Sequence, residues 1–252
     1  MGRIISVHSF RGGTGKSNIS ANLAALLARA GQRVAVVDTD IQSPGIHALF
    51  GLDEAEMGHV LNDYLWGRCE IEDAVHDVTD RLGPDCKGRL LFIPSSLNAA
   101  EIARVLHDGY DVNLLAEGFQ RLLDELRLDV LLVDTHPGLN EETLLSIAVS
   151  QVLVVVLRPD KQDYQGTAVT VEVARELGVP AMRLVVNKVP AVFDAAAIRA
   201  RVEEAYGCRV GAVLPHSDEL MALASDGLFV LRHPDSVLSR ELARLAQDVV
   251  AP

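Results

Sequence analysis

The sequence predicts one α/β domain over residues 1–252, with a mostly parallel, twisted sheet and helices on both faces. Short apolar runs alternate with segments of helical spacing along the whole chain, as in repeated β-α units. Hydrophobic residues make up 49% of the chain and aromatic residues only 4%. The apolar content is therefore mostly Ala, Val and Leu, which suits buried parallel strands. A chain of 252 residues can bury one substantial core.

Each expected strand is a short apolar run that ends at a polar residue, proline or glycine, a pattern typical of buried strands. In chain order these runs are residues 3–9, 33–37, 90–93, 130–133, 152–157, 183–186 and 210–214. The expected helices between them have apolar residues three or four apart, and Gly31 closes the first. They are residues 17–30, 71–78, 112–126, 141–149, 165–177, 195–206, 219–224 and 237–250. Residues 41–58 are expected to be irregular, with a turn at Pro44-Gly45, and residues 83–88 to form a loop.

The most specific motif is the loop at residues 10–17, Phe-Arg-Gly-Gly-Thr-Gly-Lys-Ser, between the first strand and the first helix. Glycines let backbone N–H groups turn inward and form an anion-binding nest, and the helix N-terminus adds its dipole. Lys16 would reach the β- and γ-phosphates of a nucleotide, and the Ser17 hydroxyl would ligate Mg²⁺. The standard P-loop pattern has glycine where this chain has Phe10. The expected phosphate-binding residues are Gly12, Gly13, Thr14, Gly15, Lys16, Ser17 and Asn18.

Acidic residues follow two of the expected strands. Asp134 ends the apolar run at 130–133, so a buried strand would place its carboxylate beside a metal. Asp38 and Asp40 follow the second strand, where a carboxylate can hold Mg²⁺ through water or orient an attacking water molecule. Ligands bind at the carboxyl ends of strands in such sheets, and these residues lie at such ends. The expected metal-binding set is Ser17, Asp38 and Asp134.

Together these motifs resemble the MinD/ParA family of deviant Walker A P-loop ATPases, and its MinD-like side fits best. The resemblance covers nearly the whole chain. It implies that Asp40 positions the attacking water and that Asp38 supports the magnesium shell. The family's signature lysine, which reaches a dimer partner's nucleotide, is replaced here by Arg11. Arg11 would then join Lys16 and Asp40 as a catalytic residue.

The resemblance also implies a base-binding element. Asn187-Lys188 matches the family's adenine-side pair, whose Asn amide contacts the base, and Leu214-Pro215 matches a dipeptide whose backbone helps hold it. A guanine site usually has Asn-Lys-x-Asp, whereas Val189-Pro190 follows Lys188 here. The expected nucleotide is therefore ATP, bound with Mg²⁺.

The expected function is a Mg²⁺-dependent ATPase in which ATP assembles two copies and slow hydrolysis, accelerated by a protein activator, releases them. Such a switch would position or regulate a cargo, a replicon or a protein assembly. Arg11 and Phe10 motivate an alternative, a nucleotide-binding regulator or scaffold that hydrolyses little. A third interpretation, an ATP-dependent carboxylate-activating ligase, needs a second substrate pocket that the sequence does not identify. His136, in the expected second switch segment, could tune the switch, bind a partner or face solvent.

The formal net charge of −12 argues against a broadly basic surface, although a local patch for nonspecific DNA binding could exist. Its candidate residues are Arg201, Arg209, Arg232, Arg240 and Arg244. Cys69, Cys86 and Cys208 form no Cys-x-x-Cys pair and are expected to be free thiols, without the paired cysteines of iron–sulfur carriers.

A cytoplasmic location is expected, because no signal peptide precedes the first strand and no apolar run reaches the roughly 18 residues of a membrane span. The apolar stripe of the last helix, Leu238, Leu242, Leu245 and Val249, is interpreted as a core face, so no autonomous membrane binding is expected.

Overall fold

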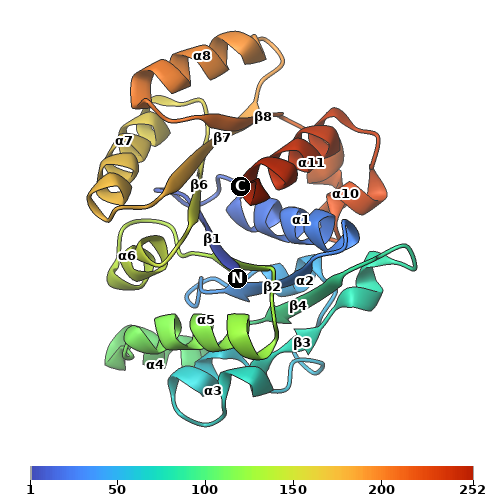
Figure 1. Ribbon diagram of the computed structural model, residues 1–252, viewed down its shortest axis with the longest axis vertical. Coiled ribbons are helices and arrows are strands. Elements are labelled where there is room, and N and C mark those ends of the chain that lie inside the picture. The colour runs from blue at the N-terminus through green and yellow to red at the C-terminus, as the bar shows by residue number, and fades with distance from the viewer. Residues whose placement is uncertain (1, 252) are drawn as a thin grey trace.

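A computed structural model describes residues 2–251 and contains one eight-stranded sheet, in the order β3-β4-β2-β5-β1-β6-β7-β8 (Figure 1). All neighbouring strands are parallel except β3 and β4. The mostly parallel sheet is therefore confirmed. The strands are β1 (Arg3–His8), β2 (Arg33–Asp38), β3 (His76–Asp77), β4 (Arg89–Ile93), β5 (Val130–Asp134), β6 (Val152–Leu157), β7 (Ala181–Val189) and β8 (Val210–Pro215).

Most helices connect successive parallel strands, and several begin at a side-chain cap. Asn98, Asn140, Asp160, Asp194, Ser217 and Ser236 each accept a hydrogen bond from a backbone N–H of the first turn that follows. The α-helices are α1 (Lys16–Arg29), α2 (Ile46–Leu49), α3 (Leu61–Leu65), α4 (Ala99–Asp108), α5 (Asn113–Glu125), α6 (Glu141–Ala148), α7 (Lys161–Glu176), α8 (Ala195–Tyr206), α9 (Asp218–Leu223), α10 (Phe229–Arg232) and α11 (Val237–Val250). Two 3₁₀ turns, η1 (Ile71–Ala74) and η2 (Thr79–Leu82), lie between α3 and β4.

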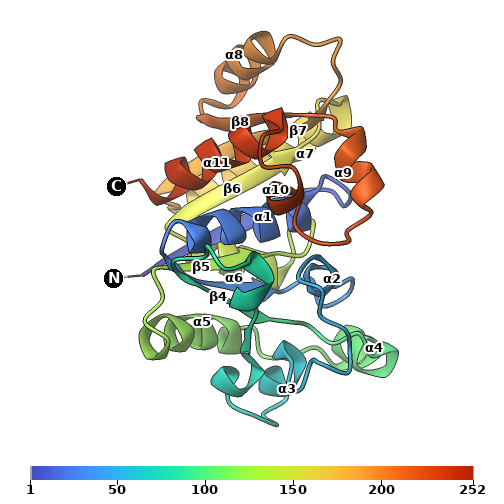
Figure 2. The same ribbon diagram turned by 90° about the vertical axis from the view of Figure 1, so that its right-hand side faces the viewer.

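The core is divided by the sheet, because successive side chains of a strand point to opposite faces. Val34 and Val36 pack with α1, α2, α10 and α11 on one face, whereas Ala35 and Val37 pack with α3 and α5 on the other. A third cluster, with α7 and α8, covers the remaining part of that second face beside β6 and β7. Figures 1 and 2 show this three-layer arrangement. The apolar stripe of α11 is buried in the first cluster, which confirms its interpretation as a core face.

The structure corrects three expectations between the second and fifth strands. Residues 71–78 are not a helix: a 3₁₀ turn ends at Ala74, and His76–Asp77 pairs antiparallel with β4. The β-branched residues Val75 and Val78 favour this extended path. Residues 41–58 include the short helix α2, and α4 forms where no helix was predicted.

Both edges of the sheet are short or covered. The edge strand β3 has only two residues. At the other edge, the backbone N–H of Val210 in β8 donates to Glu203 Oε1, and Arg199 donates to the Val210 carbonyl oxygen. Side chains of α8 thus occupy backbone groups that a further strand would use.

Candidate nucleotide site

The loop between β1 and α1 is braced from β7. Asn187 Nδ2 donates to the Thr14 carbonyl oxygen at 2.7 Å, and Lys188 Nζ donates to that of Gly13 at 2.8 Å. In a trans peptide the N–H points away from the preceding C=O. The N–H groups of Thr14 and Gly15 therefore point away from β7, which is the geometry of an anion-binding nest.

Gly15 is required by both backbone conformation and space. Its φ is 95°, in the left-handed region that favours glycine. A Cβ at this position would lie 2.5 Å from Asn187 Nδ2. The glycine thus permits the close approach of Asn187 that braces the loop.

Lys16 and Asp134 form a buried ion pair at the start of α1. Lys16 Nζ lies 3.0 Å from Asp134 Oδ2, and the Asp134 side chain is 0% exposed. Ser17 Oγ donates to Asp134 Oδ2 and Ser20 Oγ to Asp134 Oδ1, both at 2.7 Å. Three donors thus compensate one buried carboxylate, as burial of a charge requires. The Ser17 hydroxyl and the Asp134 carboxylate are also hard oxygen ligands that fit Mg²⁺.

Asp38 and Asp40 lie beside this pair because β2 and β5 are neighbours, with Asp38 opposite Asp134. The carboxylate of Asp38 accepts hydrogen bonds from the backbone N–H groups of Asp40, Gly45 and Ile46, so it also shapes the loop that follows. Burial, and then the nearby charge of Asp134, raise the pKa of Asp38 to about 7. Asp40 Oδ2 lies 3.9 Å from Lys16 Nζ, which places Asp40 near the lysine.

Two histidines complete the polar cluster. His136 Nδ1 lies 2.7 Å from Asp40 Oδ1, and this hydrogen bond raises the pKa of His136. His8 is buried at the end of β1, where its Nδ1 is 2.8 Å from Thr135 Oγ1. Burial, followed by the charge of Lys16 and the neighbouring His136, lowers the pKa of His8 to about 3. His8 is therefore neutral at physiological pH.

Arg11 lies on the opposite side of the loop from this cluster of carboxylates. Its guanidinium is exposed and donates to Gln162 Oε1 in the first turn of α7. The preceding residue, Phe10, packs its ring against Gly166 one turn further along α7, where a Cβ would overlap the ring. Arg11 is thus held against α7 of its own chain.

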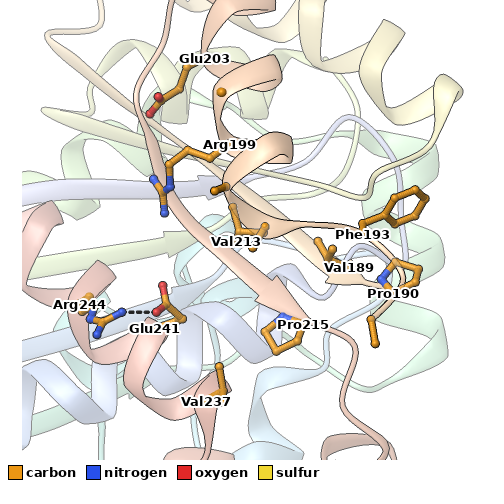
Figure 3. A pocket seen from close by; sticks show the side chains of 14 residues that line it. Val189, Pro190, Phe193, Arg199, Glu203, Val213, Pro215, Val237, Glu241 and Arg244 are labelled. Atoms are coloured by element: carbon orange, nitrogen blue, oxygen red, sulfur yellow. Dashed lines mark hydrogen bonds and ion pairs between the residues drawn. The ribbon is translucent and has the colours of Figure 1, made fainter.

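Two further predicted residues, Asn18 and Pro215, make no hydrogen bond with the cluster of Lys16 and the aspartates in the described part of the chain. Asn18 lies in the first turn of α1, and its carbonyl oxygen accepts a hydrogen bond from Asn22 Nδ2. Pro215 ends β8 and lines a pocket of about 480 Å³ between α8 and α11, along the sheet edge (Figure 3). Neither Asn187 nor the phosphate loop lines this pocket. Asn187 and Pro215 therefore lie at neighbouring strand ends with different surroundings.

Sequence reasoning missed three contributors, Ser20, Ser95 and His8, and it missed the contact of Lys188 with the loop. Ser95 Oγ donates to the Asp38 carbonyl oxygen at 2.6 Å and thereby joins the segment after β4 to the end of β2. A serine and a histidine within otherwise apolar segments were the available signal for Ser20 and His8. Nothing in the sequence indicates that Lys188 turns back, at φ 56°, to reach Gly13.

The arginines proposed as a DNA patch are largely engaged within the part of the chain that the structure describes. Arg209 pairs with Asp248 at 3.0 Å, Arg244 pairs with Glu241, and Arg201 lies over the Tyr164 ring. Arg240 donates to the Asp235 carbonyl oxygen. Within residues 2–251, no helix has the length and apolar character needed to cross a membrane.

A glycine loop that opens the first helix of a parallel sheet, with Lys, Ser and Asp converging on it, defines the class of P-loop nucleoside triphosphatases. A family model named ParA and described as "NUBPL iron-transfer P-loop NTPase" matches residues 1–250. The chain therefore belongs to the ParA/MinD family of P-loop NTPases. Members of this family are P-loop ATPases that act in positioning and regulation.

Individual relatives agree with this assignment. An uncharacterized ATP-binding protein of Methanocaldococcus jannaschii is 28% identical over 247 residues, covering 98% of this chain and 87% of the relative. The antiactivator FleN of Pseudomonas aeruginosa is 30% identical over 189 residues, covering 73% and 61% respectively. The septum site-determining protein MinD of Pyrococcus horikoshii, solved with Mg-ADP, has the same fold, with a TM-score of 0.81, 22% identity and coverage of 99% and 96%.

The family description mentions iron transfer, but the three cysteines of this chain do not form a pair that could bind iron together. Cys86, Cys69 and Cys208 each pack against a different one of the three core clusters, so no two of them converge. Among the described residues, no group of three or more His, Cys, Asp or Glu side chains is arranged to hold a metal ion.

Proposed function

We propose that this protein is a Mg²⁺-dependent ATPase whose ATP-bound form is a homodimer, and that it positions or regulates a cargo, a replicon or a protein assembly. The observation that carries the proposal is the buried cluster of Lys16, Asp134 and Asp40 beside the braced glycine loop. Lys16 is only 6% exposed, and among the described residues its ammonium, which has three donors, makes one hydrogen bond, to Asp134, so it has donors left for an anion that binds at this site. The triphosphate of ATP is such an anion.

Each residue has a distinct part in the proposed reaction. Lys16 and the N–H groups of Thr14 and Gly15 bind phosphate oxygens and stabilise the charge of the transition state. Ser17 and Asp134 hold Mg²⁺, with Asp38 behind them; the ion, when bound, neutralises charge on the β- and γ-phosphates. Asp40 orients the attacking water, and Arg11 reaches the nucleotide of the second copy. Asn187 and Pro215 border the adenine.

Partner proteins are part of the proposal. The name of FleN describes an antiactivator, and regulation of another protein is one form that the output could take here. A protein activator is proposed to accelerate slow basal hydrolysis. Nonspecific DNA binding is less favoured than a protein partner, because two of the five candidate arginines, Arg209 and Arg244, pair with carboxylates of the same chain.

The first experiment measures the solution mass of the wild type and of Asp40→Ala, each with Mg-ATP and with Mg-ADP. We expect a dimer with ATP only, and a longer-lived dimer in Asp40→Ala because hydrolysis is slowed. Steady-state ATP hydrolysis by the wild type is measured in parallel. A monomer under every condition, or hydrolysis unchanged by Asp40→Ala, contradicts the proposal.

A second candidate, a nucleotide-binding regulator that hydrolyses little, is favoured by one observation. Arg11 is engaged by Gln162, and Phe10 packs on Gly166, within a single chain. The contact between Arg11 and Gln162 must break before Arg11 can reach a second nucleotide. Arg11→Lys and Gln162→Ala discriminate: a gain in hydrolysis or dimerisation in both variants favours the regulator, and unchanged or lower activity favours the ATPase.

A further inference from the structure

The contact between His136 and Asp40 joins two segments that lie far apart in the sequence. Asp40 follows β2, and His136 follows β5, the neighbouring strand. Their side chains meet at 2.7 Å, with 20% of the His136 side chain and 11% of the Asp40 side chain exposed. The pair is therefore partly desolvated, and a charge-assisted hydrogen bond there is stronger than one at the open surface.

The direction of this hydrogen bond is fixed by chemistry. An ionised carboxylate can only accept, so Nδ1 of His136 carries the proton and donates it to Asp40 Oδ1. Among residues 2–251, this is the only hydrogen bond that the Asp40 carboxylate accepts. Its other oxygen, Oδ2, has Lys16 Nζ at 3.9 Å, too distant for a hydrogen bond.

His136 is itself held in place by its backbone. Its carbonyl oxygen accepts from Thr143 Oγ1 in α6 at 3.3 Å. Two residues later, the N–H of Gly138 donates to the Ser9 carbonyl oxygen at 3.1 Å, with Gly138 at φ 91°. The imidazole thus lies on a segment that is anchored to Ser9, the residue after β1, and to α6, whereas Asp40 begins an irregular loop.

We propose that His136 is a positioning residue for ATP hydrolysis, which fixes the Asp40 carboxylate in the orientation that holds the attacking water. This inference rests on the role proposed above for Asp40. A carboxylate with one remaining oxygen and one fixed rotamer presents a single acceptor to water. Without His136, rotation about the Asp40 side chain spreads that acceptor over several directions, and misplacement by about 1 Å costs up to about 100-fold in rate.

The test compares kcat and KM for ATP in the wild type, His136→Ala and His136→Asn. We expect His136→Ala to lower kcat by about 10- to 100-fold with little change in KM, because Asp40 is proposed to act on water and not on ATP binding. His136→Asn keeps an N–H donor near the position of Nδ1, and we expect it to recover part of the lost rate. His107→Ala, on an exposed histidine of α4, is the matched control and should leave kcat unchanged.

A double-mutant cycle separates positioning from an independent role. In the Asp40→Ala background, His136→Ala should cause no further loss, since the group that it orients is gone. An equal loss in both backgrounds, or a His136→Asn variant no faster than His136→Ala, overturns the inference and leaves the proposed ATPase intact. Absence of hydrolysis by the wild type instead contradicts the proposed function itself.

Discussion

The two sides of the phosphate loop are built differently. On the side of Lys16, the charged groups are buried, and Asp134 accepts three hydrogen bonds or ion pairs from α1. On the side of Arg11, the guanidinium is exposed and is held by one glutamine. On the buried side, water cannot reach the charged groups to replace their hydrogen bonds. On the exposed side, Arg11 can exchange its contact with Gln162 for a contact with water or another group. The proposed roles follow this division, with Lys16 directed to the chain's own nucleotide and Arg11 to that of a second copy.

The largest expected difference between the two sides is in the free energy of unfolding. Asp134→Ala removes the buried carboxylate that Lys16, Ser17 and Ser20 share and leaves Lys16 without its ion-pair partner at 3.0 Å, so we expect a loss of about 3–5 kcal/mol. Urea denaturation of the nucleotide-free protein measures it. Arg11→Ala is the matched change on the exposed side and should alter stability by no more than about 0.5 kcal/mol. Similar losses in the two variants would remove the contrast.

A fall in pH should lower the free energy of unfolding, because His8 on the buried side resists protonation in the folded protein. Its folded-state pKa of about 3 lies below the ordinary 6.5, so the unfolded chain binds a proton that the folded chain refuses. Between these two pH values, His8 costs stability at up to about 1.4 kcal/mol per pH unit as the pH falls. Asp38 acts in the opposite direction, because its pKa is raised to about 7 and folding favours its protonation.

The comparison of wild type with His8→Asn isolates this effect, since Asp38 is present in both proteins. We expect the wild type to lose stability more steeply than His8→Asn between pH 6 and 4, measured by urea denaturation at each pH. Parallel pH profiles would mean that His8 is protonated in the folded protein and that the desolvation of this side is weaker than inferred.

A steric contact on the exposed side can be tested through stability as well. A Cβ in Gly166→Ala would overlap Phe10, so the loop must shift, at a cost of about 1–3 kcal/mol. Removing the ring in the Phe10→Gly, Gly166→Ala double variant should relieve most of that loss, which thermal denaturation of the four proteins would detect. Additive losses would show that Phe10 and Gly166 do not act as a pair, and that something else holds this side of the loop.

The sequence was sufficient for the parts of the molecule that depend on local pattern. Alternating apolar runs predicted the parallel strands, and the loop at residues 10–17 with the aspartates after two buried strands predicted a set of Ser17, Asp38 and Asp134, which the structure brings together. These predictions succeed because the carboxyl ends of parallel strands meet at one edge of the sheet. The metal, nucleotide and catalytic roles of the individual residues stay predictions.

Contacts between side chains distant in the chain were not predictable in the same way. Asn187 was predicted to contact a base, which stays a prediction; the structure adds that its amide donates to the Thr14 carbonyl oxygen and braces the loop, a contact that the sequence did not indicate. The pairing of His136 with Asp40 depends on strand order, which a single sequence does not give. The helix predicted for residues 71–78 was wrong, because the pairing of His76–Asp77 with β4 outweighs the helical spacing of the apolar residues.

The side chains that cover Val210 at the edge of β8 also bear on solubility. An edge strand with free N–H and C=O groups is a template on which further chains can add, and such addition leads to aggregation. Glu203 and Arg199 occupy these groups at the start of β8, and the opposite edge ends in the two-residue β3. Addition of a further strand is therefore disfavoured at the start of β8 and at the short edge strand β3.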